Sequence, residues 1–385
     1  MKKVLVLASV ASMIEQFNMP NIELLQSLGY AVEVACNFEK GSTYPDEINA
    51  QLREKLEAMD VRYHQIDFSR DILNLRKNLL AMKQVKALFH DNAYCLVHCH
   101  SPIGGVVGRL VAGKARRQGT KVVYTAHGFH FYKGAPLFNW LVYYAVERFL
   151  ARYTDVLITI NQEDYGRAKK FRAGRVEYVP GVGVDTAKIS NTACNEKQIR
   201  KALGVPEKAH VVLSVGELSR RKNHKLIINA MTGLRDLDIR YVICGTGPLL
   251  EELENLCDQL GVKQNVIFAG YRSDIYKILK IADVFVFPSI QEGLPVALME
   301  AMAGGVPCVV SEIRGNVELI QNGINGYVCS LGSKDEFERY IRILCNDKPL
   351  GQKMGQKSAE FVKNFDSGLV NGRMREIYTS ILETD

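Results

Sequence analysis

The chain has 385 residues, of which 47% are hydrophobic and 24% charged, and it carries a formal net charge of +7. This composition is typical of a soluble globular protein, and the length allows two domains of ordinary size. No apolar run reaches the roughly twenty residues that a membrane-spanning helix needs, so the sequence excludes that class.

Nine cysteines are scattered along the chain, and their odd number argues against a disulfide framework and for a reducing compartment. The run His98-Cys99-His100 could suggest a metal site. It ends a strand-like segment, in which successive side chains point to opposite faces, and no CxxC or HExxH motif accompanies it. We therefore expect no metal.

The positive charge is concentrated in the first half of the chain. Residues 1–180 contain 24 Lys and Arg against 17 Asp and Glu, whereas residues 181–385 contain 25 of each kind. The excess is densest between Arg70 and Lys133. It indicates either a solvated basic face or attraction to an anionic membrane surface or a diphosphate-bearing acceptor. Because no nucleic-acid-binding module is visible, we expect no nucleic-acid partner.

The chain begins with a predicted strand, Lys3 to Ala8, whose lysines and apolar run could be mistaken for a signal peptide but lack a cleavage pattern. A helix from Asn21 to Leu28 and a strand from Tyr30 to Ala35 complete a parallel unit. The first turn lacks the GxGxxG of nicotinamide dehydrogenases. It is small and polar, so its amides could face a phosphate; the residues concerned are Ser9, Ala11 and Ser12.

The alternation of helices and strands continues through the first half. Predicted helices cover 46–60, 73–89, a segment ending at Arg117, and the long apolar and aromatic run Leu137 to Ala151. Predicted strands are Leu96–His98, Lys121–Ala126, Asp155–Thr159 and Val176–Pro180. Glycines and a polar, weakly periodic stretch follow Pro180 and mark a domain boundary. We place the domains at 1–184 and 185–365.

The second half repeats the pattern. Its predicted strands are His210–Gly216, Arg240–Cys244, Val266–Ala269, 282–287, Val306–Val310 and 326–328. Its predicted helices are Lys225–Leu234, Leu249–Leu260, Ile275–Ile281, Val296–Ala303, Ser333–Cys345, Gly351–Val362 and Ser367–Leu382. The sequence therefore predicts an α/β fold with two parallel sheets.

The most informative stretch runs from Pro288 to Pro307, PSIQEGLPVALMEAMAGGVP. A strand leads into a loop with Glu292, a Gly-Leu-Pro turn, and a helix that contains Glu300. Amides at a helix N-terminus suit a phosphate, and Gly293 allows a ligand to approach the backbone. Two carboxylates can hold hydroxyls, so the stretch predicts a site for a sugar nucleotide at the carboxyl end of a strand. The alternative is an ordinary strand-loop-helix with two solvated glutamates.

The spacing of Glu292 and Glu300, together with EGLP, the MEAMA helix and the Gly-x-Pro exit, resembles the signature of retaining GT-B glycosyltransferases of family 4. The resemblance extends over nearly the whole chain. It implies two Rossmann-like domains that face each other across a cleft, an N-terminal one for the acceptor and a C-terminal one for the nucleotide sugar. It also implies that the last helix, 366–385, packs back on the first domain.

The resemblance implies roles for individual residues. Lys222 would contact the donor diphosphate, Glu292 a hydroxyl of the donor sugar, Glu300 the ribose hydroxyls, and His127 would lie near the sugar as a catalytic residue with Lys222 and Glu292. Donor contacts are further expected from the loop and turn residues Gly216, Arg220, Arg221, Tyr271, Arg272, Gly293, Leu294 and Pro295. These groups would stabilise a departing diphosphate without a metal, and no cofactor is implied.

Two positions depart from the family pattern. Glu217 stands where the family has an arginine, so Arg220 or Arg221 would have to supply that phosphate contact. The first-turn Gly-Gly is also replaced. The segment SVASMIEQFNMPNIELLQSLGYAVEVACNF resembles a subgroup of exopolysaccharide and capsule assembly. That subgroup implies a glycan or polyprenyl-diphosphate-linked acceptor and a cytoplasmic enzyme, peripheral at the inner face of the plasma membrane.

The expected reaction is transfer of a hexosyl or N-acetylhexosaminyl group from a UDP-sugar with retention. Two other functions fit the same architecture. One is isomerisation by a UDP-GlcNAc 2-epimerase, which needs acid and base groups at the sugar but no acceptor. The other is a non-catalytic partner that binds a nucleotide sugar for another transferase.

Overall fold

The computed structural model describes residues 1–40, 46–69 and 74–383. The chain divides into two compact units, Met1–Val182 with Val370–Asp385 (unit 1) and Gly183–Leu369 (unit 2). The sequence placed the boundary two residues later, after residue 184. Arg70 and the predicted helix start at residue 73 lie outside the described residues, as do residues 384 and 385.

Unit 1 is built on a parallel sheet of seven strands in the order β3-β2-β1-β4-β5-β6-β7. Its strands are β1 Lys3–Val10, β2 Ala31–Asn37, β3 Arg62–Gln65, β4 Tyr94–His100, β5 Lys121–Ala126, β6 Val156–Thr159 and β7 Arg175–Tyr178. Its helices are α1 Ala11–Phe17, α2 Met19–Ser27, α3 Asp46–Ala58, α4 Leu75–Asp91, α5 Pro102–Val111, α6 Gly113–Arg116, α7 Leu137–Asn139, α8 Ala145–Leu150, α9 Gln162–Ala168 and α19 Ser367–Leu382. A π-helical turn, Trp140–Tyr144, joins α7 to α8, and a 3₁₀ turn, Ala151–Tyr153, follows α8.

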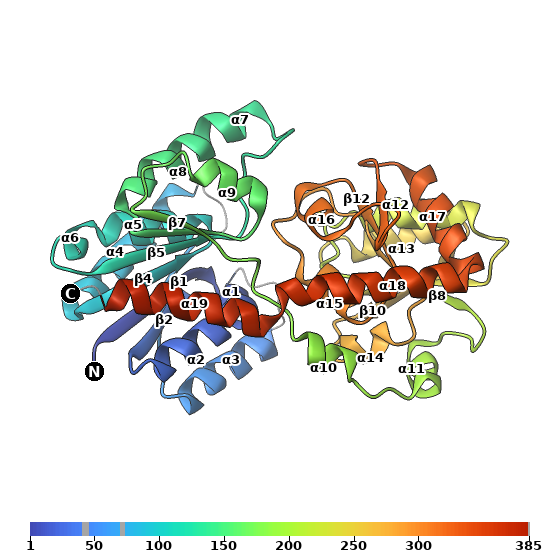
Figure 1. Cartoon of the computed structure of the whole chain (residues 1–385), viewed down its shortest axis with the longest axis horizontal. Coiled ribbons are helices and arrows are strands. Elements are labelled where there is room, and N and C mark those ends of the chain that lie inside the picture. Colours follow the sequence, from blue (N-terminus) through green and yellow to red (C-terminus); the bar gives the residue numbers. More distant parts are fainter. Residues whose placement is uncertain (41–45, 70–73, 384–385) are drawn as a thin grey trace. The chain divides into compact units, whose positions relative to one another are not determined.

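Alternating side chains of β1 divide the core of unit 1 into two layers. Val4 and Val6 pack with α1, α2, α3 and α19, whereas Leu5 and Leu7 pack with α4, α5 and α9. A strand whose two faces are both buried reads as a continuous apolar run, as β1 does. Figure 1 shows α19 in red beside the blue N-terminal elements, although the two segments lie at opposite ends of the sequence.

Unit 2 contains a parallel sheet of six strands in the order β10-β9-β8-β11-β12-β13. Its strands are β8 His210–Val215, β9 Ile239–Cys244, β10 Val266–Gly270, β11 Val284–Phe287, β12 Cys308–Ser311 and β13 Gly326–Cys329. Its helices are α10 Thr186–Ser190, α11 Glu196–Leu203, α12 His224–Ala230, α13 Leu250–Gln259, α14 Ile275–Leu279, α15 Val296–Ala303, α16 Arg314–Leu319, α17 Lys334–Asn346 and α18 Lys348–Val362. Three short 3₁₀ turns complete this unit's helical segments, Met231–Gly233, Lys263–Asn265 and Lys363–Phe365.

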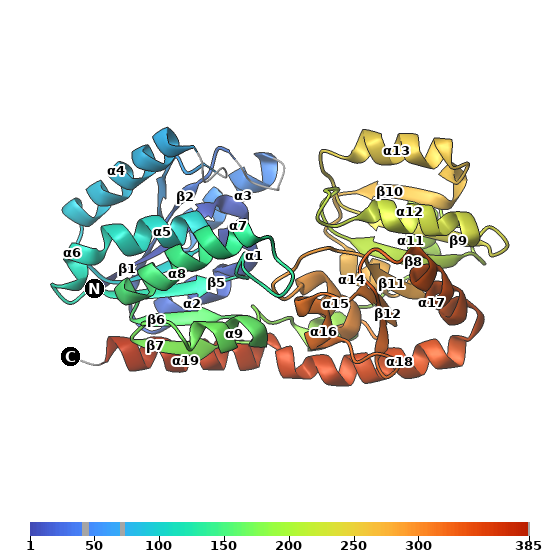
Figure 2. The ribbon, with the colours of Figure 1, turned by 90° about the horizontal axis from the view of Figure 1, so that it is seen from above.

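The helices α12, α13 and α17 pack on one face of this sheet through a shared apolar cluster. Figure 2 shows α12 and α13 side by side in yellow tones. The predicted α/β class with two parallel sheets is therefore confirmed.

The structure corrects several predicted elements. The stretch after Pro180 that lacks periodicity holds α10 and the start of α11, which begin after the helix-capping residues Asp185 and Asn195. The predicted turn after Ala8 is the end of β1 followed by α1, so Ser9 lies in the strand and Ala11 opens the helix. The elements β3, α9 and α16 had no prediction.

None of the nine cysteines, all of which lie in the described residues, forms a disulfide bond. The helices in the described ranges include none that combines the length and apolarity required to cross a membrane.

Glu33, in β2, connects four strands of unit 1 through contacts with β1, β3 and β4. Its carboxylate accepts hydrogen bonds from the Tyr94 hydroxyl at 2.6 Å and from His64 at 2.8 Å, and it pairs with Lys3 at 2.9 Å. Burial alone would raise the pKa of Glu33, but these donors outweigh it and lower the pKa from 4.5 to about 2.

We expect this network to make unit 1 sensitive to acid. The pKa of Glu33 is lower in the folded protein than in the unfolded chain, so the ionised carboxylate stabilises the fold above pH 4.5. This contribution to the free energy of unfolding, up to roughly 3 kcal/mol, is lost as the pH falls towards 2. Thermal unfolding of Glu33→Gln should therefore depend less on pH between 6 and 2.5 than that of the wild type. The exposed Glu39→Gln is the control, and parallel curves for Glu33→Gln and the wild type would contradict the assignment.

Candidate active site

The topology of unit 2 marks one position as a ligand site. Strand β8 lies between β9 and β11. From β8 the chain adds β9 and then β10 on one side, and it then crosses to the other side of β8 to add β11, β12 and β13. In open parallel sheets, ligands bind outside the carboxyl ends of the strands at such a switch point. The loops that leave β8 and β11 there, 216–223 and 288–295, carry most of the predicted donor residues.

Two cations from the first loop converge on a carboxylate of the second. Glu292 Oε1 lies 2.8 Å from Lys222 Nζ and 2.7 Å from the Arg221 guanidinium. The side chains of Lys222 and Glu292 are 13% and 10% exposed, whereas that of Arg221 is 44% exposed. Lys222 Nζ also lies 4.5 Å from the ring centre of Phe287 in β11. The site therefore has two cations for one carboxylate.

The ionisation of the pair follows from its surroundings. Burial lowers the pKa of Lys222, and the charge of Glu292 opposes that effect only in part. For Glu292, burial raises the pKa, but the charges of Lys222 and Arg221 lower it below its usual value overall. Glu292 is thus ionised at neutral pH.

Backbone contacts hold the two loops together. The Ile290 amide donates to the Arg221 carbonyl at 2.9 Å, and the Asn223 side chain donates to the Pro288 carbonyl at 3.3 Å. Gly216 permits the arrangement, because a Cβ there would lie 3.0 Å from Lys222 Cε. Arg314, from α16, donates to the Glu292 carbonyl at 3.1 Å.

The helix α15 begins directly after the EGLP turn, with Pro295 at its N-cap and no side chain capping it. The first amides of a helix have no intrahelical acceptor and carry a partial positive charge. They begin at Val296, four residues beyond Glu292 in the sequence, because Pro295 has no amide hydrogen. Helix amides and cations thus meet at this loop, which suits an anion.

Glu300 lies in the middle of α15 and is half-buried. It is hydrogen-bonded to Tyr276 of α14. Burial raises the pKa of Glu300 from 4.5 to about 7, with Tyr276 opposing the shift. At neutral pH this group is therefore present both as the protonated acid, which can donate a hydrogen bond, and as the carboxylate, which only accepts. Both forms can hydrogen-bond to hydroxyl groups.

The remaining predicted donor residues are more dispersed. Arg272 follows β10 and makes two hydrogen bonds to Asp274, at 2.8 and 2.6 Å, while Tyr271 is 46% exposed. Arg220 is exposed. Of the two arginines considered as substitutes for the missing cation at Glu217, the structure brings Arg221 to Glu292.

His127 belongs to unit 1, where it follows β5. Its Nε2 lies 3.1 Å from His100 Nδ1, and its ring centre lies 5.1 Å from that of Phe17. Burial lowers the pKa of His127 to about 4, so the imidazole is neutral at pH 7. His98 bonds to Tyr378 of α19 at 2.7 Å and to Thr125 at 2.8 Å.

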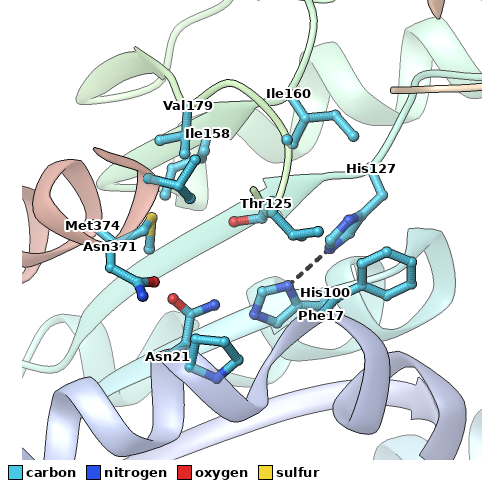
Figure 3. A pocket seen from close by; sticks show the side chains of 14 residues that line it. Phe17, Asn21, His100, Thr125, His127, Ile158, Ile160, Val179, Asn371 and Met374 are labelled. Carbon is cyan, nitrogen blue, oxygen red and sulfur yellow. Dashed lines mark hydrogen bonds between the residues drawn. The ribbon is translucent and has the colours of Figure 1, made fainter. Parts of the chain in front are cut away.

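Figure 3 shows the cavity that His127 and His100 line together with Phe17, Asn21 and Asn371. Its volume of about 30 Å³ is that of about one water molecule. His100 Nε2 is buried and has no hydrogen-bond partner among the described residues. A small polar group placed there would satisfy it.

The other predicted positions of unit 1 lie at the adjacent strand end. The Ser9 amide donates to the Ser101 hydroxyl at 3.1 Å, and the side chains of Ala11 and Ser12 are buried. Within the described ranges, no group of three or more His, Cys, Asp or Glu side chains is arranged to hold a metal ion.

Three residues of these sites were not singled out in the sequence: Tyr276, Asn223 and Arg314. His100 was considered there only as part of a possible metal cluster, not as the partner of His127. His100 had a signal, because it ends the strand next to that of His127 in the same sheet. Tyr276 and Arg314 come from neighbouring helices, and only the tertiary packing brings them to Glu300 and Glu292.

The sequence and fold can be compared with known proteins at this point. The family of glycosyl transferases group 1 matches residues 195–361, and a glycosyl transferase 4-like family matches residues 3–161. EpsD of Bacillus subtilis (strain 168), which is named as a glycosyltransferase, is 36% identical over the whole of this chain and 98% of its own. The chain belongs to glycosyltransferase family 4.

A second relative of this family 4 glycosyltransferase comes from Escherichia coli. It is named UDP-Gal:alpha-D-GlcNAc-diphosphoundecaprenol alpha-1,3-galactosyltransferase and is 31% identical over 80% of this chain and 81% of its own. Among solved structures, Anabaena HepE in complex with UDP and glucose superposes with a TM-score of 0.80, at 20% identity, over 99% of this chain and 100% of its own. Sucrose-phosphate synthase from Thermosynechococcus elongatus gives 0.79 at 18% identity over all of both chains. These likenesses confirm the GT-B fold.

The raised pKa of Glu300 predicts a pH-dependent stability of the glycosyltransferase. Because the folded protein favours the protonated form, stability falls as the pH rises from 4.5 to about 7, by up to roughly 3 kcal/mol. Glu300→Gln, which mimics the protonated acid, should therefore melt at a higher temperature than the wild type at pH 8, and the difference should vanish at pH 4.5. The exposed Glu254→Gln serves as the control; a lower melting temperature for Glu300→Gln at pH 8 would contradict the shift.

Proposed function

We propose that this glycosyltransferase transfers a hexosyl or N-acetylhexosaminyl group from a UDP-sugar to a glycan or polyprenyl-diphosphate-linked sugar. Transfer would proceed with retention at the anomeric carbon and without a metal. The observation that carries the proposal is the buried ion pair of Lys222 and Glu292 at the switch point of unit 2, 2.8 Å apart. In this pair, Lys222 would be the cation that binds the diphosphate, and Glu292 would be the carboxylate that binds a hydroxyl of the sugar.

The donor diphosphate would bind to Lys222 and Arg221 and to the amides of Gly293 and Leu294. These groups are already positioned by the contacts between the two loops, so little reorganisation is needed when negative charge develops on the leaving group. Arg221 would thereby supply the charge that the family places at position 217. Glu292 would accept a hydroxyl of the donor sugar and stabilise its oxocarbenium character.

Glu300 would accept the ribose hydroxyls, and Tyr271 and Arg272 would flank the uracil. Both segments follow the carboxyl edge of the same sheet, at β11 and β10 respectively. A base, a ribose and a diphosphate could then occupy successive positions along that edge. His127, neutral and held by His100, would contact the sugar from its own unit.

In the transfer step, the bond between the anomeric carbon and the oxygen of the β-phosphate breaks. The acceptor hydroxyl oxygen forms the new bond on the same face of the sugar, and its proton passes to the leaving phosphate. Lys222 and Arg221 balance the charge of the departing UDP. No carboxylate in the predicted set is assigned as a covalent nucleophile.

The names of related proteins support the choice of substrates. The relative from Escherichia coli is named for transfer from UDP-Gal to a GlcNAc-diphosphoundecaprenol, and HepE was solved with UDP and glucose. A polyprenyl-linked acceptor would place this chain in the cytoplasm, peripheral at the inner face of the plasma membrane. The relationship to EpsD is in keeping with a role in cell-surface polysaccharide synthesis.

Removing either member of the ion pair should abolish most of the transfer activity. We expect Lys222→Met and Glu292→Gln each to lower turnover by on the order of a hundredfold, the effect of losing one transition-state contact. The measurement is UDP release from a panel of UDP-sugars in the presence of a GlcNAc-diphospho-lipid acceptor.

Two matched substitutions control for loss of charge alone. Lys225→Met removes an exposed lysine three residues from Lys222, and Glu251→Gln removes an exposed glutamate of α13. Both should retain wild-type turnover, and circular dichroism should show that all four variants fold. Wild-type turnover in Lys222→Met and Glu292→Gln would end the assignment.

Chelation tests the role given to the cations. If Lys222 and Arg221 balance the leaving charge, millimolar EDTA should leave the rate of UDP release within about twofold of its untreated value. Mg²⁺ or Mn²⁺ added afterwards should have as little effect. Loss of activity with EDTA and its recovery with either ion would show that a metal performs this task.

A further inference from the structure

A helical segment of unit 1, residues 137–153, has an outward face that is unusually apolar. Leu137, Phe138, Leu141 and Phe149 are 81%, 59%, 76% and 47% exposed. The spacing of Leu137, Leu141 and Phe149 puts them on one side of the helix. Single exposed apolar residues are ordinary, but a continuous strip of large ones indicates an interaction surface.

The inward face of the same segment carries its buried charge. Glu147 is 7% exposed and pairs at 2.8 Å with Arg109 of α5, whose side chain is fully buried. The Tyr124 hydroxyl donates to the other oxygen of Glu147 at 3.2 Å. Figures 1 and 2 both show α8 beside α5. The inward side also packs Tyr144 and Ala151 against the core, so the segment is apolar on both sides, and the buried ion pair fixes the orientation in which the apolar strip faces outward.

A basic cavity adjoins the end of this segment. It has a volume of about 680 Å³ and is lined by Lys114, Arg116, Arg117, Lys121, Arg152 and Asp155, among others. Asp155 pairs with Arg116 at 2.6 Å, so four further cations surround the cavity. The Arg152 guanidinium also lies 5.4 Å from the ring centre of Phe149, which joins the cavity to the apolar strip.

We propose that unit 1 docks on an anionic lipid bilayer through this surface. The docking surface consists of the apolar strip (Leu137, Phe138, Leu141 and Phe149) and the basic rim (Lys114, Arg117 and Arg152). Apolar side chains enter the boundary between headgroups and acyl chains, and cations beside them attract anionic headgroups. An apolar strip flanked by cations, with few acidic residues nearby, is complementary to an anionic membrane. A neutral partner would not require the cations.

The docking surface runs from one edge of the sheet to the other. Lys121 begins β5 and Asp155 immediately precedes β6, so the basic cavity lies at the amino ends of these strands. The apolar strip begins at Leu137, beside the loop that leaves the carboxyl end of β5, where the Asn139 side chain donates to the His130 carbonyl at 2.8 Å. Its first residues therefore lie at the same edge of the sheet as His127.

The inference rests on the proposed function only in that a lipid-linked acceptor gives membrane docking a purpose. Vesicle binding is measured without donor or acceptor, so its failure would leave the transfer assay unaffected. Conversely, a protein that bound vesicles but showed no transfer activity would contradict the proposed function and still support the docking surface.

Trp140 is the only tryptophan of the chain and lies within the segment. Its fluorescence is therefore a reporter that requires no labelling. The full chain is mixed with vesicles of phosphatidylcholine alone or with 30% phosphatidylglycerol, and binding is followed by sedimentation and by quenching of Trp140 with brominated acyl chains. We expect binding and quenching with the anionic vesicles, and at least tenfold weaker binding to the neutral ones.

Two variants separate the contributions. Leu137→Ser/Leu141→Ser/Phe149→Ser should lower the partition coefficient at least tenfold by removing buried apolar area. Lys114→Gln/Arg117→Gln/Arg152→Gln should lower it about a hundredfold at low salt, since each cation near an anionic surface contributes roughly fivefold. The charge effect should shrink at 0.5 M salt, where screening is short-ranged.

The controls remove similar groups from unit 2. Lys348→Gln/Lys353→Gln/Lys357→Gln neutralises three exposed lysines of α18, and Leu331→Ser removes an exposed leucine. Both should bind vesicles like the wild type. The proposal is overturned if the wild type ignores anionic vesicles, or if the control variants lose binding as much as the surface variants do. It is also overturned if the serine variant turns a dimer into a monomer in sedimentation while vesicle binding is unchanged.

Discussion

The contact on which the candidate site of unit 2 depends is the one between Glu292 and the cations of the neighbouring loop. Glu292 is held by Lys222 and Arg221, and the two loops are also joined by a backbone hydrogen bond from Ile290 to Arg221 and by the Asn223 side chain. A lysine so little exposed would be costly without its partner, because an unpaired buried charge is strongly disfavoured. The pair therefore holds the two loops against each other.

The sequence predicted what depends on local pattern. The bounds of β5, α15 and α19 agree to the residue with the apolar periodicity and the turn signals around them. The helix α10 was missed because it is five residues long and buries only Ile189, and α11 because its apolar face consists of only Ile199 and Leu203. The strand β3 is only four residues long and half exposed, so it carries little pattern at all.

For the site, the motif identified Glu292, Glu300 and Lys222, but not which groups would meet. Nothing local in the sequence distinguishes Arg220 from Arg221, because their orientations depend on how the loop after β8 closes on the loop after β11. His100 and Tyr276 act through contacts between elements distant in the sequence. Their roles become visible only once the sheets and helices are assembled. Roles towards donor and acceptor remain predictions for all of these residues.

The hydrogen bond between Tyr378 and His98 has a consequence for biosynthesis. It joins the last helix of the chain to a strand made 280 residues earlier, and the side chains of α19 fill one layer of the core of unit 1. During translation, the apolar residues of that layer stay exposed until the whole of unit 2 has left the ribosome and α19 has been made. Unit 2 is continuous in sequence and can fold as it emerges, so the half that is made first is the half that is finished last.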